Sequence, residues 1–204
     1  MIPKSYNLPD FEIFNSSNLN DFKIWIPDKM YIVIGRSNNI EDSVFIEKVK
    51  EERIEIFKRP SGGETVILSP KTAVISVKLN VKNELNVHHY FKEINTIIIS
   101  ALSELGIKNL NQKGISDISI GNKKILGSSI YRKPDKIFYH AVLNISEDVS
   151  LISKYLKHPK KEPDYRKGRS HDEFVTSINK ENYMLDNEAI IGKISNSLSN
   201  LINK

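Results

Sequence analysis

Asp117-Ile-Ser-Ile120, Lys124-Ile-Leu-Gly-Ser-Ser-Ile-Tyr131 and Ile137-Phe-Tyr-His-Ala-Val-Leu-Asn144 are three consecutive runs rich in apolar, β-branched and aromatic residues. Gly121-Asn122 lies between the first two runs, and such a pair favours the tight turn of a β-hairpin. The three runs therefore predict neighbouring strands around which the remainder of the chain has to pack.

Further strand-like runs precede these three. They cover residues 22–26, 30–34, 54–57, 65–68 and 72–79. Pro27-Asp28-Lys29 predicts a turn between the first two of them. Ser69-Pro70-Lys71 separates the last two by the spacing of a hairpin, so we expect those two strands to pair with each other.

The clearest helix is predicted from about His89 to Leu105, where apolar residues recur at spacings of three and four and Gly106 supplies the stop. Residues 147–156 and 186–202 are further predicted helices, and residues 40–50 allow a short one. The pattern predicts an α+β fold with a mixed, mostly antiparallel sheet flanked by helices. We expect residues 1–204 to form one domain.

Length and composition exclude several classes of protein. The 204 residues, 39% hydrophobic and 27% charged, suit one domain with its own core. The absence of cysteine excludes disulfides, thiolate metal sites and a cysteine nucleophile. The sequence has no apolar run long enough to span a bilayer and no signal-peptide layout, so we expect a cytoplasmic protein without membrane contact. The net charge of +5 suits an anionic nucleotide or an acidic protein, and nucleic acid is not expected as a partner.

A first candidate site lies in Lys58-Arg-Pro-Ser-Gly-Gly-Glu-Thr-Val66, between two predicted strands. Paired glycines allow consecutive backbone N–H groups to surround an anion, and Arg59 could add a charge-assisted bond to a phosphate or carboxylate. The segment is not a P-loop, because no Gly-Lys-Ser or Gly-Lys-Thr follows the glycines. A tight hairpin with exposed cations is the alternative, and this segment by itself leaves both open.

A second candidate site lies on the strands predicted over residues 117–120, 124–131 and 137–144. A lysine at a strand end, such as Lys124, neutralises charge on a transferring phosphoryl group, and Gly127 would leave room for a ligand. Asp117 could hold Mg²⁺. The alternatives are an exposed turn lysine and a turn-capping aspartate. Strand alternation places His140 on the same face of the strand as Phe138. On that face it is either a core residue or part of a site.

Residues 157–170 form a polar stretch rich in lysine and arginine. Such a loop is either a solvated surface or a lid that faces an anion.

Read together, five motifs resemble the biotin/lipoate protein ligase family, and in particular its lipoate-protein ligase A branch. The motifs are Tyr31-Ile-Val-Ile-Gly-Arg-Ser-Asn-Asn39, Lys58-Arg-Pro-Ser-Gly-Gly63, Gly114-Ile-Ser-Asp-Ile118, Lys124-Ile-Leu-Gly-Ser-Ser-Ile-Tyr-Arg132 and Phe138-Tyr-His-Ala-Val-Leu143. The resemblance covers roughly residues 23–200. It implies the catalytic-domain fold of this family, which is similar to that of class II aminoacyl-tRNA synthetases.

The resemblance implies an ATP-dependent ligase that activates lipoate to lipoyl-AMP with ATP and Mg²⁺. The lipoyl group then passes to a lysine of a lipoyl-carrier protein, such as a dehydrogenase acyltransferase subunit or a glycine-cleavage H protein. Without cysteine the chain cannot use the thioester route of octanoyl transferases and amidotransferases on this fold. The alternatives are a thiol-independent octanoyl or lipoyl transferase and a non-catalytic subunit that binds lipoate or nucleotide.

The resemblance also implies roles for individual residues. Lys124 matches the essential lysine, which acts electrostatically between the carboxylate and the α-phosphate and also contacts the nucleotide. The other residues expected at the nucleotide are Arg59, Ser61, Gly62, Gly63, Glu64, Thr65, Val66 and Ile67. Those expected at the acyl group are Arg36, Gly127, Ser128 and His140. Asp117 falls at the acidic position expected to hold Mg²⁺.

Several features depart from the family pattern. Glu64 replaces a third glycine, and Leu68 replaces a histidine. The sequence before residue 23 lacks a convincing amphipathic helix of the kind that walls the acyl pocket in this family, so we expect residues 157–169 to cover the ligand. We also expect the small accessory domain of longer ligases to be absent from the chain and supplied by a separate polypeptide.

Overall fold

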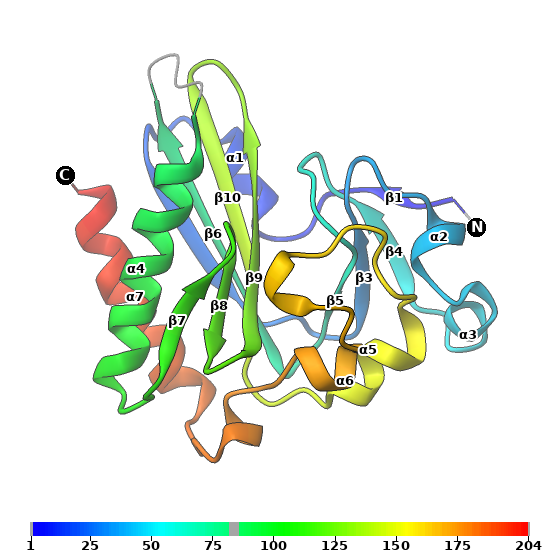
Figure 1. Cartoon of the computed structure of the whole chain (residues 1–204). Helices are drawn as coiled ribbons and strands as arrows, with labels where there is room; N and C mark the ends of the chain where they lie inside the picture. Colours follow the sequence, from blue (N-terminus) through cyan, green and yellow to red (C-terminus); the bar gives the residue numbers. More distant parts are fainter. Residues whose placement is uncertain (1, 82–85, 204) are drawn as a thin grey trace.

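Two β-sheets lie side by side in the computed structural model, which describes residues 2–81 and 86–203 (Figure 1). The larger sheet consists, in spatial order, of β2 (Asp21–Trp25), β6 (Thr72–Asn80), β10 (Lys136–Asn144), β9 (Lys123–Arg132), β8 (Asp117–Ile120) and β7 (Leu110–Lys113). Its neighbouring strands are all antiparallel. The smaller sheet consists of β1 (Lys4–Ser5), β4 (Glu55–Lys58), β3 (Tyr31–Ile34) and β5 (Val66–Leu68). In it β1 and β3 run parallel to β4, and β5 runs antiparallel to β3.

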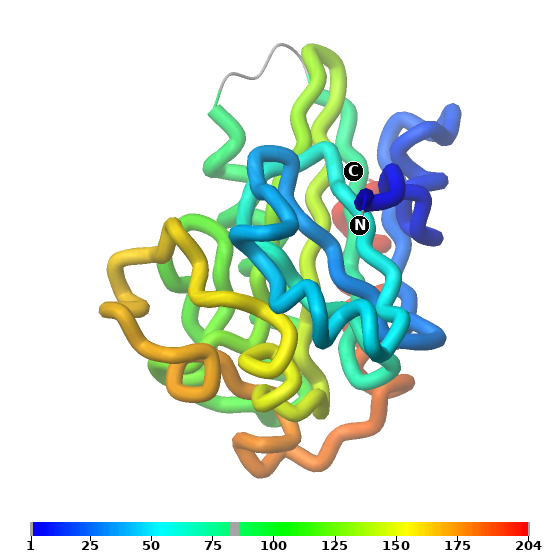
Figure 2. Tube along the Cα trace, turned by 90° about the vertical axis from the view of Figure 1, so that its right-hand side faces the viewer, coloured from blue at the N-terminus to red at the C-terminus, as the bar shows by residue number. Residues whose placement is uncertain are grey.

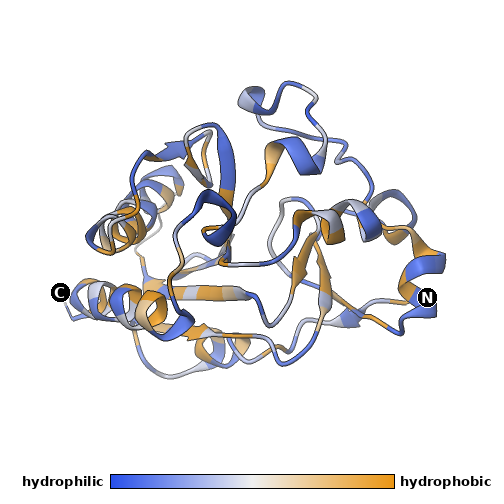
Figure 3. Cartoon of the chain, turned by 90° about the horizontal axis from the view of Figure 1, so that it is seen from below, coloured by the Kyte–Doolittle hydropathy of each residue, from blue (hydrophilic) through white to orange (hydrophobic). Residues whose placement is uncertain are grey.

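Two long helices, α4 (His88–Glu104) and α7 (Asn187–Ile202), cover one face of the larger sheet (Figure 1). In α4 the spacing of Ile94, Ile98 and Leu102 places these side chains on one side of the helix, and all three are fully buried in the main core. Apolar residues concentrate on the strands and on the helix sides that face them, with hydrophilic residues in the loops (Figure 3).

The remaining helices are short. They are α1 (Phe11–Asn15), α2 (Ile40–Ser43), α3 (Ile46–Glu51), α5 (Val149–Tyr155) and α6 (His171–Phe174), with 3₁₀ turns at Asp164–Arg166 and Asn179–Glu181. Residues of α2, α3 and α5 pack with the smaller sheet in a second core. In the described residues no helix is both long and apolar enough to cross a membrane.

The predicted α+β class with mostly antiparallel strands is confirmed, but the predicted hairpin between residues 65–68 and 72–79 is wrong. Thr72 N donates to Ser69 O at 3.0 Å in a turn that carries the chain from one sheet to the other. β5 pairs with β3, whereas β6 pairs with β2 and β10. β6 has eight buried residues out of nine, and buried backbone N–H and C=O groups need hydrogen-bond partners, which a strand on each edge supplies.

Other differences concern short elements. The strands predicted on either side of Pro27-Asp28-Lys29 form, but β2 and β3 belong to different sheets. The predicted helix over residues 40–50 is divided at Val44, whose extended backbone bridges to Leu156. The short helix α1 and the edge strand β7 were not predicted, because neither is long enough to show a clear periodicity.

The end of β3 lies against the glycine loop at residues 61–64. Arg36 N donates to Ser61 O at 2.9 Å, and Arg59 N donates to Ile34 O at 3.0 Å. A Cβ atom at Gly35 would lie 2.0 Å from Gly63 O, far inside contact distance. Only glycine at residue 35 permits this approach of two backbone segments.

We therefore expect Gly35→Ala to lower the free energy of unfolding by about 1–3 kcal/mol, because the clash is with backbone and forces the loop to shift. Urea unfolding followed by circular dichroism measures the change. Gly192→Ala on α7 is the control, since a Cβ atom there meets nothing within 4 Å. We expect that helix position to gain stability from alanine, and a Gly35 variant as stable as wild type would contradict the close contact.

Candidate active site

A cavity of about 1130 Å³ lies between the two sheets. One set of lining residues is apolar and includes Val33, Val66, Leu68, Val74 and Val142. Another set is polar and comprises Asn38, Glu64, Asp117, Lys124, Lys157 and Lys160. The cavity can therefore accommodate an extended ligand with one apolar and one anionic portion.

Lys124 and Asp117 form an ion pair in this cavity. The Lys124 Nζ atom lies 2.8 Å from Asp117 Oδ1, with the two side chains 29% and 7% exposed. β8 and β9 are neighbours, and a register irregularity after Ile118 places Lys124 opposite Ser119. The lysine side chain lies across Gly127, where an added Cβ atom would be 2.5 Å from Nζ. The ion pair thus holds the Lys124 ammonium in a fixed position beside Gly127, which has no side chain to displace it.

Tyr165 covers this ion pair from the opposite side. Its hydroxyl donates to Asp117 Oδ2 at 2.9 Å. Burial, together with the negative charge of Asp117, raises the pKa of Tyr165. The tyrosine ring packs against Phe174 with centroids 5.0 Å apart. Asp117 therefore accepts from Lys124 and Tyr165 at once.

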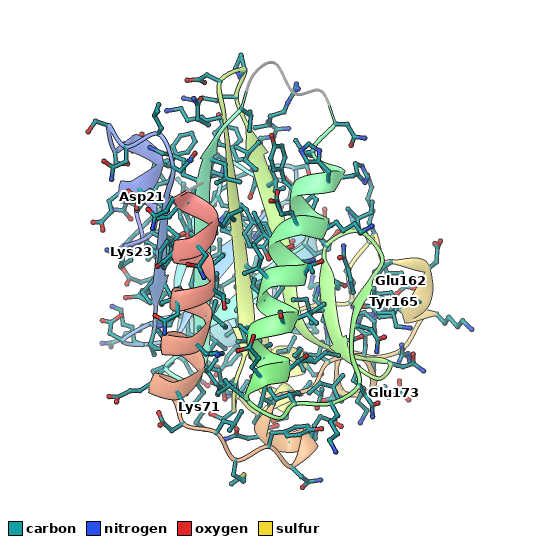
Figure 4. All side chains as sticks on the ribbon, turned by 90° about the vertical axis from the view of Figure 1, so that its left-hand side faces the viewer. Asp21, Lys23, Lys71, Glu162, Tyr165 and Glu173 are labelled. Carbon is teal, nitrogen blue, oxygen red and sulfur yellow. The ribbon has the colours of Figure 1, made fainter. Side chains whose placement is uncertain are left out.

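The segment that carries Tyr165 is attached on both sides of the cavity. Towards the smaller sheet, Lys160 pairs with Asp42 at 2.7 Å. Towards the larger sheet, Arg169 donates to Asn122 O at 3.2 Å. Figure 2 shows this part of the chain, yellow to orange, on the side opposite the dark blue N-terminal segment, and Figure 4 shows Tyr165 and Glu162 extending from it. Residues 157–166 line the cavity, which is the place expected for the lid.

Arg59 is buried in the glycine loop. Its guanidinium donates to Gly62 O and Glu64 O, each at 2.8 Å, and to Val33 O at 3.2 Å. Burial lowers the pKa of Arg59 to about 10. Arg59 lines the cavity, but most of its donors are used to hold the loop.

The residues after the paired glycines also line the cavity. Asn38 donates to a Glu64 carboxylate oxygen at 3.1 Å, which orients this acid beside the cavity. Among the described residues, the buried hydroxyl of Thr65 has no hydrogen-bond partner. Buried polar atoms are normally hydrogen-bonded, and this hydroxyl is an exception. Gly63, Val66 and Ile67 line the cavity as well.

His140 is a buried neutral imidazole in the cavity wall. Its Nε2 atom shares a hydrogen bond with Ser61 Oγ. Burial and the positive charge of Arg59 lower the pKa of His140 to about 3, so the ring is neutral at pH 7. Gly127, Ser128 and His140 line the cavity, and their contact with an acyl group stays a prediction.

Arg36 is absent from the described lining of the main cavity. It lines a smaller hollow of about 280 Å³ together with Pro60, Ser61, Gly62, Ile130, Tyr131 and Arg132. The hydrogen bond from Arg36 N to Ser61 O ties it to the glycine loop. Ser61 and Gly62 border this hollow too, so their predicted contact with nucleotide, like that of Arg36 with the acyl group, stays a prediction.

Asp117, the residue expected to hold Mg²⁺, has both carboxylate oxygens paired, one with Lys124 and one with Tyr165. The described residues contain no group of three or more His, Asp or Glu side chains arranged to bind a metal ion. Mg²⁺ in phosphoryl-transfer sites is commonly held by one or two carboxylates together with substrate phosphates. Asp117 is a carboxylate in the cavity wall, and a Mg²⁺ ion there would replace one of these two bonds, so this role stays a prediction.

Two features of the site were not predicted from the sequence. Tyr165 contacts Asp117, which lies 48 residues before it in the sequence. The one sequence feature that pointed to Tyr165 was its place within the basic stretch. Tyr6 lines the cavity from a segment in which the sequence shows no family motif.

The low pKa of His140 predicts a pH dependence of stability. Between about pH 3 and its ordinary value of 6.5, the unfolded state takes up a proton that the folded state excludes, so stability falls as pH falls. This histidine is expected to account for a loss of about 2 kcal/mol between pH 7 and pH 5. We expect His140→Gln to remove that loss.

Urea unfolding at both pH values measures the effect. The exposed His88 is the matched control, and His88→Gln should keep the wild-type pH dependence. If the free energy of unfolding falls equally between pH 7 and pH 5 in the His140 variant and in wild type, the imidazole is not held in its neutral form.

Comparisons with known proteins agree with this geometry. The model of the lipoyl protein ligase A/B catalytic domain matches residues 14–199. Among curated relatives, lipoate-protein ligase A of Psychrobacter cryohalolentis is 30% identical over 151 residues, which is 73% of this chain and 43% of that protein. An octanoyltransferase of Prochlorococcus marinus is 30% identical over 115 residues, 55% of this chain and 52% of that protein. The chain thus spans about half the length of these relatives or less.

Solved structures share the fold. A bi-partite lipoate protein ligase, described with its E2 lipoyl domain, from Thermoplasma acidophilum has a TM-score of 0.82 at 19% identity, with 95% of this chain and 76% of that chain covered. A lipoate-protein ligase A bound with ATP has a TM-score of 0.81 at 18% identity, with 100% and 86% covered. With the family model matching most of its length, the chain belongs to the lipoyl protein ligase A/B catalytic domain family.

Proposed function

We propose that this chain is the catalytic part of an ATP-dependent lipoate-protein ligase. It forms lipoyl-AMP from lipoate and ATP and transfers the lipoyl group to a lysine of a lipoyl-carrier protein. The observation that carries the proposal is the Lys124–Asp117 ion pair in a cavity that offers both apolar and polar walls.

Each part of the two substrates has a matching part of the cavity. The apolar residues, with His140 and Gly127, receive the acyl chain, because burial of methylenes is favourable there. The loop from Gly63 to Ile67, which lines the cavity, receives the nucleotide. Lys157 and Lys160 add positive charge on the lid side of the triphosphate.

In the first half-reaction the lipoate carboxylate oxygen attacks the α-phosphorus of ATP. A new P–O bond forms, the bond to the bridging oxygen breaks with its electron pair, and pyrophosphate leaves. The ammonium of Lys124 is beside the developing negative charge and stabilises it without bond formation. Asp117 orients Lys124, and Mg²⁺ held by Asp117 would neutralise phosphate charge.

In the second half-reaction the amine of the carrier lysine attacks the acyl carbonyl carbon. AMP leaves with the electrons of the mixed-anhydride bond, and the amine loses a proton as the amide forms. Lys124 again stabilises the charge on the oxygens, since carbonyl and phosphate are adjacent. For transfer, the lid must open or shift to admit the carrier, which requires the Tyr165–Asp117 hydrogen bond to break.

An acyl-serine route, as an alternative transferase mechanism, has less support. Ser61 and His140 are hydrogen-bonded, but Ser61 borders the smaller hollow rather than the main cavity. A histidine with a pKa of about 3 is also a weak general base at neutral pH. The chain has no cysteine to replace the serine. Octanoyltransferases do occur among the relatives, so octanoate belongs among the acids to be tested.

The proposed partners follow from the reaction. The acceptor is a lipoyl domain, such as that of a dehydrogenase acyltransferase subunit, or a glycine-cleavage H protein. A bi-partite ligase occurs among the structural neighbours, so the proposal includes a second, small polypeptide that assists adenylation.

The test is lipoate-dependent exchange of labelled pyrophosphate into ATP with Mg²⁺. We expect exchange in wild type, with the accessory polypeptide if required, and a loss of at least about 100-fold in Lys124→Ala because the transition-state charge loses its cation. The matched control is Lys123→Ala, since Lys123 is adjacent in sequence and 46% exposed and does not line the cavity.

Exchange by Lys124→Ala at the wild-type rate would refute the role given to this lysine. Binding of lipoate and ATP by wild type without exchange, even with the accessory polypeptide, would instead favour a non-catalytic binding subunit.

Gly127→Ala tests the position of Lys124 separately from its charge. The new Cβ atom would lie 2.5 Å from Nζ and 2.6 Å from Cε, so the flexible end of the lysine has to move. We expect the exchange rate to fall roughly 10- to 100-fold, as for a misplaced catalytic group, with little change in thermal unfolding. Gly192→Ala should leave exchange unchanged, and full exchange by the Gly127 variant would contradict this placement of Lys124.

A further inference from the structure

The N-terminal segment contributes one side chain, that of Tyr6, to the described lining of the cavity. Tyr6 directly follows β1, and its N–H donates to Lys58 O at 3.2 Å. The ring is 7% exposed and belongs to the same apolar cluster as Val33, Leu68 and Val74, which also line the cavity. Tyr6 is therefore part of the apolar portion of the wall.

On the side of the Tyr6 ring away from the cavity lies a buried hydrogen-bonded group centred on Asp10. The tyrosine hydroxyl donates to Asp10 Oδ1 at 2.8 Å, and Asp10 is fully buried. The same carboxylate accepts from Ser76 Oγ at 2.7 Å and Trp25 Nε1 at 3.2 Å. Asp10, Ser76 and Trp25 do not line the cavity, so the cavity stops at the Tyr6 ring.

The ring is also fixed in place. Turning it aside would break its hydrogen bond to Asp10 and leave a buried carboxylate short of a donor, which is costly. His140 packs edge-on to the ring with centroids 6.1 Å apart and limits movement on another side. Tyr6 is thus a rigid boundary of the apolar wall.

We propose that Tyr6 is a specificity-determining residue that sets the length of the acyl chain the cavity accepts. The inference rests on the proposed function, because it takes the apolar portion to hold the hydrocarbon chain of a carboxylic acid. Acids with an eight-carbon backbone, such as lipoate and octanoate, end at the ring. Longer straight chains meet the ring and are excluded.

Shortening the side chain at residue 6 opens space for additional methylenes. Each buried methylene strengthens binding about fourfold, which corresponds to ~0.8 kcal/mol. We therefore expect Tyr6→Leu to improve the affinity for decanoate relative to octanoate by about tenfold or more compared with wild type.

Isothermal titration calorimetry of the full chain with octanoate, decanoate and dodecanoate measures the ratios, with thermal unfolding as the check on folding. Tyr31→Leu is the matched control. Tyr31 is in the same apolar cluster, is 8% exposed and donates to Asp28 at 2.6 Å, but does not line the cavity. Its substitution should leave the affinity ratios as in wild type.

If Tyr6→Leu does not fold, Tyr6→Met provides the same test, since an unbranched side chain adapts to the cluster. A folded Tyr6 variant with the wild-type ratio, or an equal shift in the Tyr31 variant, would overturn the assignment. So would the absence of binding of all three acids to wild type. Acid binding with the expected shift but without pyrophosphate exchange, even with the accessory polypeptide, would support the assignment and refute the ligase proposal.

Discussion

The buried guanidinium of Arg59 holds the glycine loop that lies between the two sheets at the cavity. It binds the carbonyl of Val33 at the end of β3 and the carbonyls of Gly62 and Glu64 in the glycine loop. That loop is bound in turn to the larger sheet, because Ser129 donates to Gly62 O at 2.9 Å. A buried cation is costly unless its donors are paired, so the loop is held to the conformation that satisfies Arg59.

This arrangement has a functional consequence. A rigid loop between the sheets fixes the distance between the apolar wall, contributed largely by β3, β5, β6 and β10, and the ion pair of Lys124 on β9 with Asp117 on β8. Catalysis by charge requires a cation that is already in place before reaction, since reorganisation during the reaction would cost free energy. Gly127 and the hydrogen bond from Tyr165 to Asp117 also keep Lys124 in place, because Gly127 leaves room for the lysine and Tyr165 holds its partner.

Much of the fold could be predicted because it depends on local signals. The spacing of Ile94, Ile98 and Leu102 predicts α4 almost to its ends, and alternation aims His140 into the space between the sheets. Strand partners depend on contacts between distant residues, and there the prediction was less successful. The turn at residues 69–71 looks the same whether the next strand pairs back or enters another sheet, so β5 and β6 were wrongly expected to pair.

The sequence by itself determined the family, the cavity-lining motifs and the absence of a thiol mechanism, because these follow from residue identity and order. Only the tertiary structure decided that Arg59 holds the loop with most of its donors, that Arg36 borders a separate hollow, and that Tyr6 closes the apolar wall. These three outcomes depend on which buried groups find partners across the chain. Partner choice is settled by packing and by the free-energy cost of unsatisfied polar groups, and neither is encoded in local sequence spacing.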